Sequence, residues 1–266
     1  MKPGTILTAI LVLIIASCKS VKNMSGTGFH KNMVIAHRGA WKTNNLPENS
    51  IASLKQAIKI GCTGSEFDVH LTADDSLVIC HNDDYQGMMI EKSTFAQLAT
   101  KPLSNGERIP TLREYIEAAN NQNKTRLVLE IKKSIISNDR TLVLTKKCVD
   151  EVRNTHAQNI VVYISFDYAA CLKVRELDKN ANIEYLNGDI APEKIKADNL
   201  NGIDYNISVF TKHPEWIAEA KKLNVDLNVW TVNKKEDLQF FLNQKFDLIT
   251  TNEPELLFSL IGNSGK

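Results

Sequence analysis

The chain has 266 residues, of which 43% are hydrophobic and 24% charged, an ordinary globular composition that supplies enough apolar side chains for a real core. A formal net charge of +1 argues against a surface that binds nucleic acid or another polyanion. The five cysteines contain no CxxC pair and no zinc-like spacing. Four of them, Cys62, Cys80, Cys148 and Cys171, lie in apolar segments, where we expect buried thiols. A disulfide among them stays open for an exported protein.

Residues 1–17 have the layout of an export signal: Lys2 is followed by an apolar run from Ile6 to Ala16, which is too short to span a bilayer comfortably. The run ends in Ile15-Ala16-Ser17-Cys18, which resembles the bacterial lipobox. The resemblance implies cleavage before Cys18 and a lipid anchor on its thiol, and so a place in the bacterial cell envelope. The alternatives are an ordinary signal peptide and an uncleaved anchor. Residues 18–32 are polar and are expected to form a flexible tether.

From residue 33 to residue 262 the chain alternates between apolar runs of strand length and segments with apolar residues at helical spacing. Eight strands are predicted, at residues 33–36, 65–69, 127–131, 160–164, 183–186, 203–206, 227–231 and 247–250. Helices are predicted at residues 50–58, 111–120, 142–153, 169–179, 192–199, 214–223, 236–243 and 254–261. This alternation predicts one α/β domain, a TIM-type (β/α)8 barrel. A doubly wound open sheet is the alternative.

A further short apolar arm, residues 77–80, follows the second strand too soon for a parallel crossover. We therefore expect a β-hairpin arm here. If Asp74 and Asp75 form a two-residue turn, Asp68 lies opposite His81. Residues 82–111 are expected to be mostly loop, with a short helix near 95–99.

Polar groups stand at the ends of several predicted strands, where barrel enzymes carry their reactive groups. The first strand ends in His37-Arg38-Gly39, and a strand end that simply meets solvent is the alternative. On the second strand Glu66 and Asp68 share one face, because residues two apart point the same way. Buried side by side they need a cation between them, and oxygen ligands suit Ca²⁺ or Mg²⁺. An acidic pair on a solvated strand end would need none.

Two later strand ends add to this set. Glu130 could complete a three-carboxylate cation site, and Lys132, on the same face, could neutralise an anion or simply pair with Glu130. Trp230 could wall a pocket or pack in the core. Two imidazoles, an arginine, a lysine and three carboxylates are together what phosphoester cleavage needs.

With these residues the chain resembles the glycerophosphodiester phosphodiesterase family. The resemblance rests on nine motifs in the family's order: His37-Arg38-Gly39, Pro47-Glu48-Asn49-Ser50, Glu66-Phe67-Asp68, Val78-Ile79-Cys80-His81, Ile109-Pro110-Thr111-Leu112, Leu129-Glu130-Ile131-Lys132, Ser165-Phe166, Trp230-Thr231-Val232-Asn233 and Thr251-Asn252-Glu253-Pro254.

The resemblance implies a metal-dependent enzyme that cleaves glycerophosphodiesters to sn-glycerol 3-phosphate and an alcohol, with a small-molecule substrate and membrane association through the lipid anchor only. It implies a role for each matching residue: His37 and His81 as the acid–base pair, Arg38 and Lys132 on the phosphate, Glu48 supporting the site, Trp230 on the glycerol side, and Glu66, Asp68 and Glu130 as ligands of Ca²⁺ or Mg²⁺.

The chain departs from the family pattern at two places. Asn82 stands where an aspartate usually follows the second histidine, and Asp84-Tyr85-Gln86-Gly87-Met88-Met89 replaces a Leu-x-Arg-Thr-Thr run in a shortened segment. Three alternatives stay open: a phosphatidylinositol-specific phospholipase C-like lipase, for which Met88-Met89-Ile90 would supply exposed apolar residues; a lipoprotein that binds phosphorylated ligands without turnover; and a metal-dependent sugar-phosphate lyase.

Overall fold

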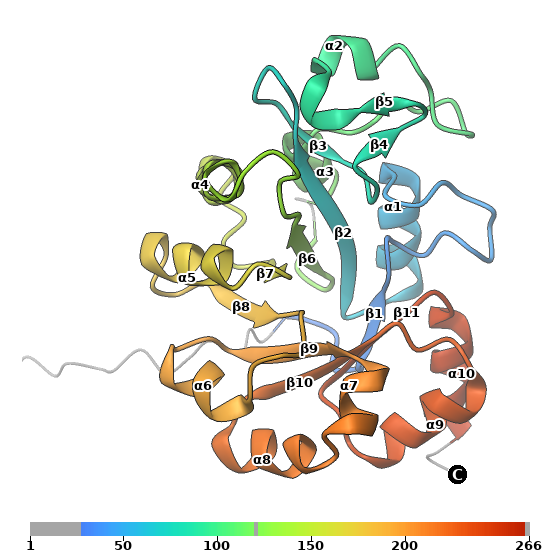
Figure 1. Ribbon diagram of the computed structural model, residues 1–266. Helices are drawn as coiled ribbons and strands as arrows, with labels where there is room; N and C mark the ends of the chain where they lie inside the picture. The colour runs from blue at the N-terminus through green and yellow to red at the C-terminus, as the bar shows by residue number, and fades with distance from the viewer. Residues whose placement is uncertain (1–27, 120–121, 264–266) are drawn as a thin grey trace, which may run out of the picture.

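The computed structural model describes residues 28–119 and 122–263 (Figure 1). The expected export signal and Cys18 lie outside these residues. Within the described ranges, no helix combines the length and the apolar character needed to cross a bilayer. Cys62, Cys148 and Cys171 are buried free thiols, as predicted, whereas Cys80 is a free thiol that is only partly buried.

Eight parallel strands in these ranges form a closed barrel, because β1 pairs with β11 on one side and with β2 on the other. Around the barrel the order is β1, β11, β10, β9, β8, β7, β6, β2. The strands are β1 (Val34–Ala36), β2 (Gly64–Leu71), β6 (Arg126–Ile131), β7 (Val161–Ser165), β8 (Asn182–Tyr185), β9 (Gly202–Asn206), β10 (Asp226–Trp230) and β11 (Leu248–Thr251). The closure confirms the predicted barrel and excludes the open sheet.

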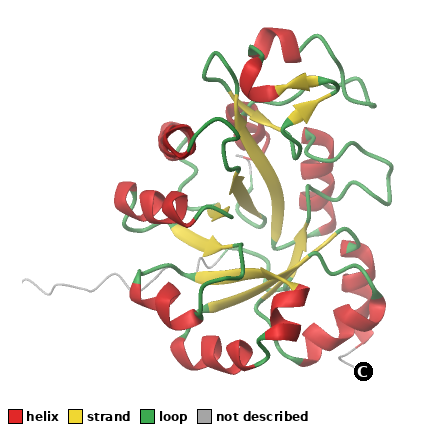
Figure 2. Ribbon diagram, in the orientation of Figure 1, coloured by secondary structure: helices red, strands yellow, loops and turns green. Residues whose placement is uncertain are grey.

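Each barrel strand leads to a helix on the outside, and Figure 2 shows the helices arranged around the strands. These helices are α1 (Ile51–Ile60), α3 (Leu112–Ala119), α4 (Asn138–Asn154), α5 (Tyr168–Leu177), α6 (Pro192–Ala197), α8 (Glu215–Leu223), α9 (Lys235–Asn243) and α10 (Pro254–Asn263).

Two helical features differ from the prediction. Helix α4 begins one turn earlier than expected, because Ser137 accepts the Arg140 N–H at 3.1 Å and caps a polar first turn that has no apolar periodicity. A short helix, α7 (Ile207–Lys212), was not expected; the side chain of Asn206 caps it by accepting the Ser208 N–H.

Side chains of each strand alternate between two environments. Leu127, Leu129 and Ile131 of β6 pack in the main core between the strands and the helices. Val128 packs inside the barrel, in a smaller apolar cluster that includes Ile164. The period of two along a strand therefore decides which residues can enter the barrel interior, where Glu66, Asp68 and Glu130 lie.

After β2 the chain forms an arm that lies at the top of Figure 1. The arm comprises β3 (Leu77–Ile79), antiparallel to β2, the pair β4 (Asp84–Tyr85) and β5 (Met88–Met89), the 3-10 helix η1 (Ile90–Lys92) and α2 (Phe95–Leu98). The arm has its own core, in which Ile90 is fully buried and Met88 is partly buried. Residues 82–111 are therefore more ordered than the expected loop. Met88 and Ile90 do not form the exposed apolar loop that the lipase alternative requires.

The predicted hairpin register was wrong by one residue. Val69 pairs with Ile79 and Leu71 with Leu77, so that Cys80, not His81, lies opposite Asp68. The reason is a three-residue turn in place of the expected two: the Thr72 N–H donates to Ser76 across it, and Asp75 takes the left-handed conformation (φ 61°). His81 lies just beyond the end of β3.

The last residues of the expected tether are packed rather than free. The His30 N–H donates to the Lys124 carbonyl at 2.9 Å, and the Arg126 guanidinium lies 4.8 Å from the centre of the Phe29 ring. The side-chain amide of Asn32 donates to Gly61. The packed domain therefore begins before residue 33.

Candidate active site

The turn after β1 brings Arg38 to the mouth of the barrel. Arg38 is left-handed (φ 56°), an uncommon conformation for a residue with a side chain. Gly39 follows with φ 84°, and a Cβ there would lie 2.3 Å from the Ser53 hydroxyl oxygen, so that only glycine fits. The turn directs the Arg38 N–H to Glu66 Oε2, at 2.8 Å. The backbone of the His-Arg-Gly motif is therefore itself part of the site.

Three carboxylates meet inside the barrel at this end. Glu66 and Asp68 project inward from β2 and Glu130 from the neighbouring strand β6, where it pairs in register with Asp68. One oxygen of each lies within 4.8 Å of the other two, and all three residues are buried. Burial first, then the neighbouring carboxylates, raise the pKa of Glu66 well above its ordinary value and that of Glu130 to about 7.

Asp68 differs from its two neighbours because polar partners surround it. Burial would raise its pKa, but Lys132, His81 and Asn49 together hold the pKa of Asp68 below its ordinary value. Lys132 Nζ lies 3.2 Å from Asp68 and 2.9 Å from Glu130. The Asn49 amide donates to Asp68 Oδ2 at 2.8 Å, and Asn49 Oδ1 accepts the Asp68 N–H. These contacts hold Asp68 ionised and fix its orientation.

This cluster fits a hard divalent cation. Three buried carboxylates repel one another, and this repulsion adds to burial, the larger cause, in raising the pKa values of Glu66 and Glu130. A cation among them would remove it, and an all-oxygen donor set suits Ca²⁺ or Mg²⁺ rather than zinc. Glu66, Asp68 and Glu130 are thus the residues that can hold a metal ion.

His37 stands at the edge of the carboxylate cluster. Its Nδ1 lies 2.8 Å from Asn252 Oδ1, in the loop after β11, and its Nε2 lies 3.9 Å from Glu66 Oε2. Burial first and then the Arg38 guanidinium lower the pKa of His37 to about 4. At neutral pH the ring is therefore uncharged. Since the amide oxygen can only accept, Nδ1 carries the proton and Nε2 keeps a free lone pair.

His81 is held in the same manner. Its Nδ1 lies 2.8 Å from Asn82 Oδ1, so that Asn82, which replaces the usual aspartate, still orients the ring. The Arg38 guanidinium lies between Glu48 and the carboxylate cluster: its Nη1 donates to Glu48 at 2.7 Å, and its Nε lies 3.9 Å from Asp68. Glu48 thus contacts Arg38 and is not one of the three clustered carboxylates.

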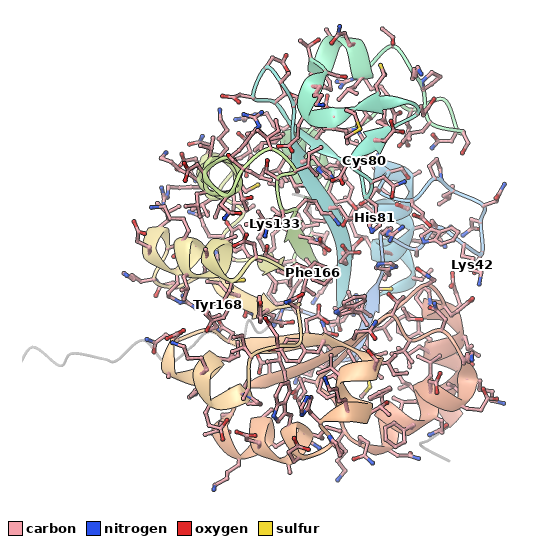
Figure 3. All side chains as sticks on the ribbon, in the orientation of Figure 1. Lys42, Cys80, His81, Lys133, Phe166 and Tyr168 are labelled. Atoms are coloured by element: carbon pink, nitrogen blue, oxygen red, sulfur yellow. The ribbon has the colours of Figure 1, made fainter. Side chains whose placement is uncertain are left out.

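Two cavities meet at Arg38 and His81. The larger, of about 200 Å³, is lined by His37, Arg38, Glu66, His81, Glu130, Ile164, Phe166, Leu186, Asp204, Trp230, Thr231 and Thr250. The smaller, of about 140 Å³, is lined by Arg38, Glu48, Asn49, Ile79, Cys80, His81, Asn82, Tyr85 and Leu103. His81 and Phe166 are labelled in Figure 3, and the Phe166 ring packs edge-to-face on Trp230, with 5.4 Å between ring centres. Lys132 does not line either cavity.

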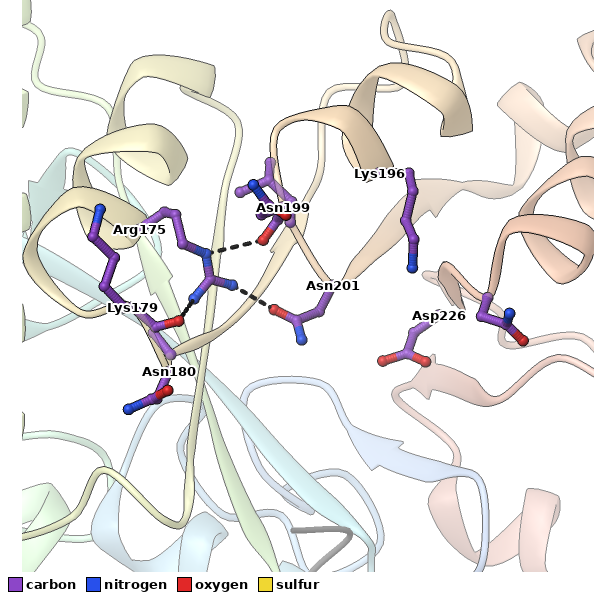
Figure 4. Close-up of a pocket in the computed structure, with 10 residues that line it drawn as sticks. Arg175, Lys179, Asn180, Lys196, Asn199, Asn201 and Asp226 are labelled. Atoms are coloured by element: carbon purple, nitrogen blue, oxygen red, sulfur yellow. Dashed lines mark hydrogen bonds between the residues drawn. The ribbon is translucent and has the colours of Figure 1, made fainter. Parts of the chain in front are cut away.

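A third cavity, of about 590 Å³, lies at the opposite end of the barrel, near the starts of β8, β9 and β10 (Figure 4). The Arg175 guanidinium, which lines this cavity, is hydrogen-bonded within the protein: it donates to the carbonyls of Asn199 and Lys179 and to the Asn201 side chain. This end of a barrel usually serves stability. The reactive groups all belong to the other end.

Comparison with known proteins assigns the chain to a family. The model of the glycerophosphoryl diester phosphodiesterase family matches residues 37–256, which contain every reactive side chain described above. This chain belongs to that family. It is a phosphodiesterase, and hydrolysis of glycerophosphodiesters is the activity that the family supports.

Individual members of the family match over most of their length. A glycerophosphodiester phosphodiesterase from Caldanaerobacter subterraneus is 31% identical over 254 residues, covering 88% of this chain and 100% of the relative. A crystal structure of a glycerophosphodiester phosphodiesterase from Parabacteroides distasonis is 37% identical with a TM-score of 0.86, covering 90% of this chain and 100% of that one. A phosphodiesterase from Oleispira antarctica, solved with the product sn-glycerol 3-phosphate, is 25% identical with a TM-score of 0.75, covering 87% and 97%.

Within this phosphodiesterase, the structure brings together all the side chains that the sequence motifs singled out, from His37 to Trp230. It adds three that sequence reasoning gave no role. Asn49 and Asn252 lie inside quoted motifs, so that their membership of a motif could have indicated a role in the site. Asp204 lies in none of the quoted motifs, and no pattern in the sequence pointed to it. It lines the larger cavity because it lies on β9, a strand of the barrel.

Proposed function

We propose that this chain hydrolyses glycerophosphodiesters to sn-glycerol 3-phosphate and an alcohol, with His37 and His81 as the acid–base pair and a divalent cation, Ca²⁺ or Mg²⁺, held by Glu66, Asp68 and Glu130. One observation carries the proposal: both imidazoles, Arg38, Glu66 and Glu130 line a single cavity. The product seen in the Oleispira relative supports glycerol 3-phosphate as the part released from the barrel.

The two cavities suggest how the substrate lies. Arg38 and His81 belong to both, so the phosphate is placed at their junction. The glycerol enters the larger cavity, against Trp230, and the alcohol enters the smaller one, against Tyr85 and Leu103. Lys132 neutralises charge on Asp68 and Glu130, and because it lines neither cavity we propose that it acts on the phosphate through these carboxylates rather than by direct contact.

The residues then perform two proton transfers. His37, uncharged and with Nε2 free, takes the proton of the glycerol 2-hydroxyl as its oxygen bonds to phosphorus. His81 gives a proton to the alcohol oxygen as the phosphorus–oxygen bond to it breaks, leaving a cyclic phosphate. In the second half water attacks phosphorus and His81 takes the water proton. The bond between phosphorus and the oxygen on carbon 2 then breaks, and His37 returns its proton to that oxygen. Arg38 stabilises the charge on the phosphoryl oxygens, and a bound divalent cation supplies further stabilisation of that charge.

The test is turnover of glycerophosphocholine, glycerophosphoethanolamine and glycerophosphoinositol, with and without a chelator. We expect cation-dependent turnover that His37→Ala and Glu66→Ala each reduce by at least about 100-fold. His213→Gln, a histidine that lines neither cavity, is the control and should keep its activity. Retained activity in both alanine variants would refute the site.

Two further readouts separate the parts of the proposal. A diester without the vicinal hydroxyl should be inert, and equal turnover of it would exclude the cyclic phosphate. Ca²⁺ or Mg²⁺ should raise the unfolding temperature of the wild-type protein but not that of Glu66→Ala, because a ligand that binds only the folded state stabilises it.

We also propose that the protein is anchored in the bacterial cell envelope through a lipid on Cys18. The lipobox-like sequence Ile15-Ala16-Ser17-Cys18 supports this. A Cys18→Ala variant should lose incorporation of a labelled fatty acid and leave the membrane fraction. Unchanged labelling would contradict the proposal.

A further inference from the structure

Asp204 is a buried acidic side chain that the two-histidine mechanism does not use. It lies on β9 between Ile203 and Tyr205, which both pack in the core outside the barrel, so the alternation of the strand directs Asp204 inward. It is 1% exposed and lines the larger cavity. In the order of the strands, β9 lies directly across the barrel from β2, which carries Glu66 and Asp68.

The neighbours of Asp204 are already paired with one another. Asn228 of β10 donates to Glu184 of β8 at 3.4 Å and accepts the Thr250 hydroxyl of β11 at 3.2 Å. The Oδ1 atom of Asp204 has no hydrogen-bond partner, although it is fully shielded from solvent. A buried polar atom without a partner is costly, and native proteins keep few of them. An unpartnered atom on a residue that lines a substrate cavity is explained if the substrate supplies the partner.

The position of Asp204 defines which part of the substrate that is. The charged groups of the cavity come from the loop after β1, from β2, β6 and the arm, whereas the wall near Asp204 is formed by apolar side chains, among them Leu186 and Trp230. The Trp230 indole donates to the backbone carbonyl of Asp204 at 2.9 Å, which holds the ring beside β9. Burial, then Glu184 and Glu130, raise the pKa of Asp204 well above its ordinary value, and a neutral carboxyl group can both donate and accept.

We propose that Asp204 binds the terminal hydroxyl of the glycerol moiety and so selects glycerol over deoxygenated diols. The inference rests on the proposed function, because that function places glycerol in this cavity. Asp204 would act in specificity alone, because β9 lies across the barrel from β2, which carries Glu66 and Asp68. An apolar pocket by itself discriminates weakly, whereas a buried polar group that loses its partner discriminates strongly.

The experiment combines removal of the carboxyl group from Asp204 with removal of the terminal hydroxyl from the ligand. Calorimetry in the presence of Ca²⁺ or Mg²⁺ would measure the affinity for sn-glycerol 3-phosphate and for its analogue without the terminal hydroxyl, propane-1,2-diol phosphate. We expect the wild-type protein to prefer glycerol 3-phosphate by about 10- to 100-fold. Asp204→Ala should bind both compounds with the lower affinity, and Asp204→Asn, which can still donate and accept, should keep most of the preference.

Glu184→Gln is the matched control, because Glu184 is an equally buried carboxylate on the adjacent strand that does not line the cavity. It should keep most of the preference, because burial, the largest cause of the raised pKa of Asp204, is unchanged. Asp204→Ala should unfold at the same denaturant concentration as the wild type or a higher one, since no protein partner is lost. A purely structural role would instead lower that midpoint.

Several results would overturn the inference: equal wild-type affinity for the two phosphates, no binding of either, or an Asp204→Ala variant that keeps the preference. Turnover of glycerophosphocholine, measured on the same preparations, separates this inference from the proposed function. If the wild-type protein discriminates between the two phosphates but shows no turnover, the proposed hydrolysis is refuted and the role of Asp204 stands. If the protein turns over glycerophosphocholine but Asp204→Ala still discriminates fully, the role of Asp204 is refuted and the proposed hydrolysis stands.

Discussion

Asn252 accepts a hydrogen bond from the Nδ1 atom of His37 at 2.8 Å, across 215 residues of sequence. The contact leaves Nε2 of the ring unprotonated and directed to the cluster of carboxylates, 3.9 Å from Glu66. Asn252 is therefore a positioning residue for His37.

Asn252→Leu should lower kcat by roughly 10- to 100-fold with little change in KM, since the ring loses its orientation but not its place in the chain. Asn252→Asp should move the acid limb of the pH–rate profile upward by about one unit, because a carboxylate stabilises the protonated ring and raises the pKa of His37 above its value of about 4. An unchanged acid limb would show that His37 is not the base.

Asn82 offers the matching test for His81, whose Nδ1 lies 2.8 Å from the Asn82 oxygen. Asn82→Leu should lower kcat by roughly 10- to 100-fold with little change in KM, because the ring loses the contact that orients it. Asn82→Asp keeps an oxygen acceptor at the same place and should retain most of the activity. The kcat and KM of both variants check this prediction, and an equal loss in both would show that the Asn82 oxygen does not orient the ring.

The smaller cavity predicts a dependence on the size of the alcohol. Leu103→Trp would fill part of its 140 Å³. The kcat/KM for glycerophosphoinositol should then fall by about 10-fold or more relative to that for glycerophosphoethanolamine, because only the larger alcohol meets the new ring. Leu172→Trp, at an exposed position of α5, serves as the control. An equal effect of Leu103→Trp on both substrates would place the alcohol elsewhere.

Glu184 predicts how stability depends on pH. Burial first, then the Asp226 carboxylate, raise its pKa from 4.5 to about 8. Between these values the folded protein holds a proton that the unfolded chain has released, so this contribution to stability is complete below pH 4.5 and is lost as the pH rises through 8. The loss should be on the order of a few kcal/mol.

Glu184→Gln cannot ionise and should lack this loss, while its side-chain oxygen still accepts from Asn228. Urea unfolding of both proteins from pH 5 to 9, in the presence of a chelator, measures the difference in the free energy of unfolding. Parallel curves would mean that Glu184 is ionised in the folded protein throughout.

The sequence by itself determined the barrel, because apolar runs and helical spacing are local patterns that repeat eight times. It also determined that Glu66 and Asp68 share a face, since the period of a strand is two. The sequence motifs also located both histidines, Arg38 and the third carboxylate, Glu130.

Only the tertiary structure decided the register and the partners. The hairpin turn has three residues: Asp75 adopts φ 61°, and hydrogen bonds from the Thr72 N–H to Ser76 and from the Asp75 N–H to Thr72 stabilise it. This turn places Cys80, where His81 was expected, opposite Asp68. The bond from His37 to Asn252 and the position of Asp204 across the cavity depend on which strands become neighbours when the barrel closes. Closure is a long-range event, and local patterns along the chain did not indicate that it would bring Asn252 to His37 or Asp204 into the cavity.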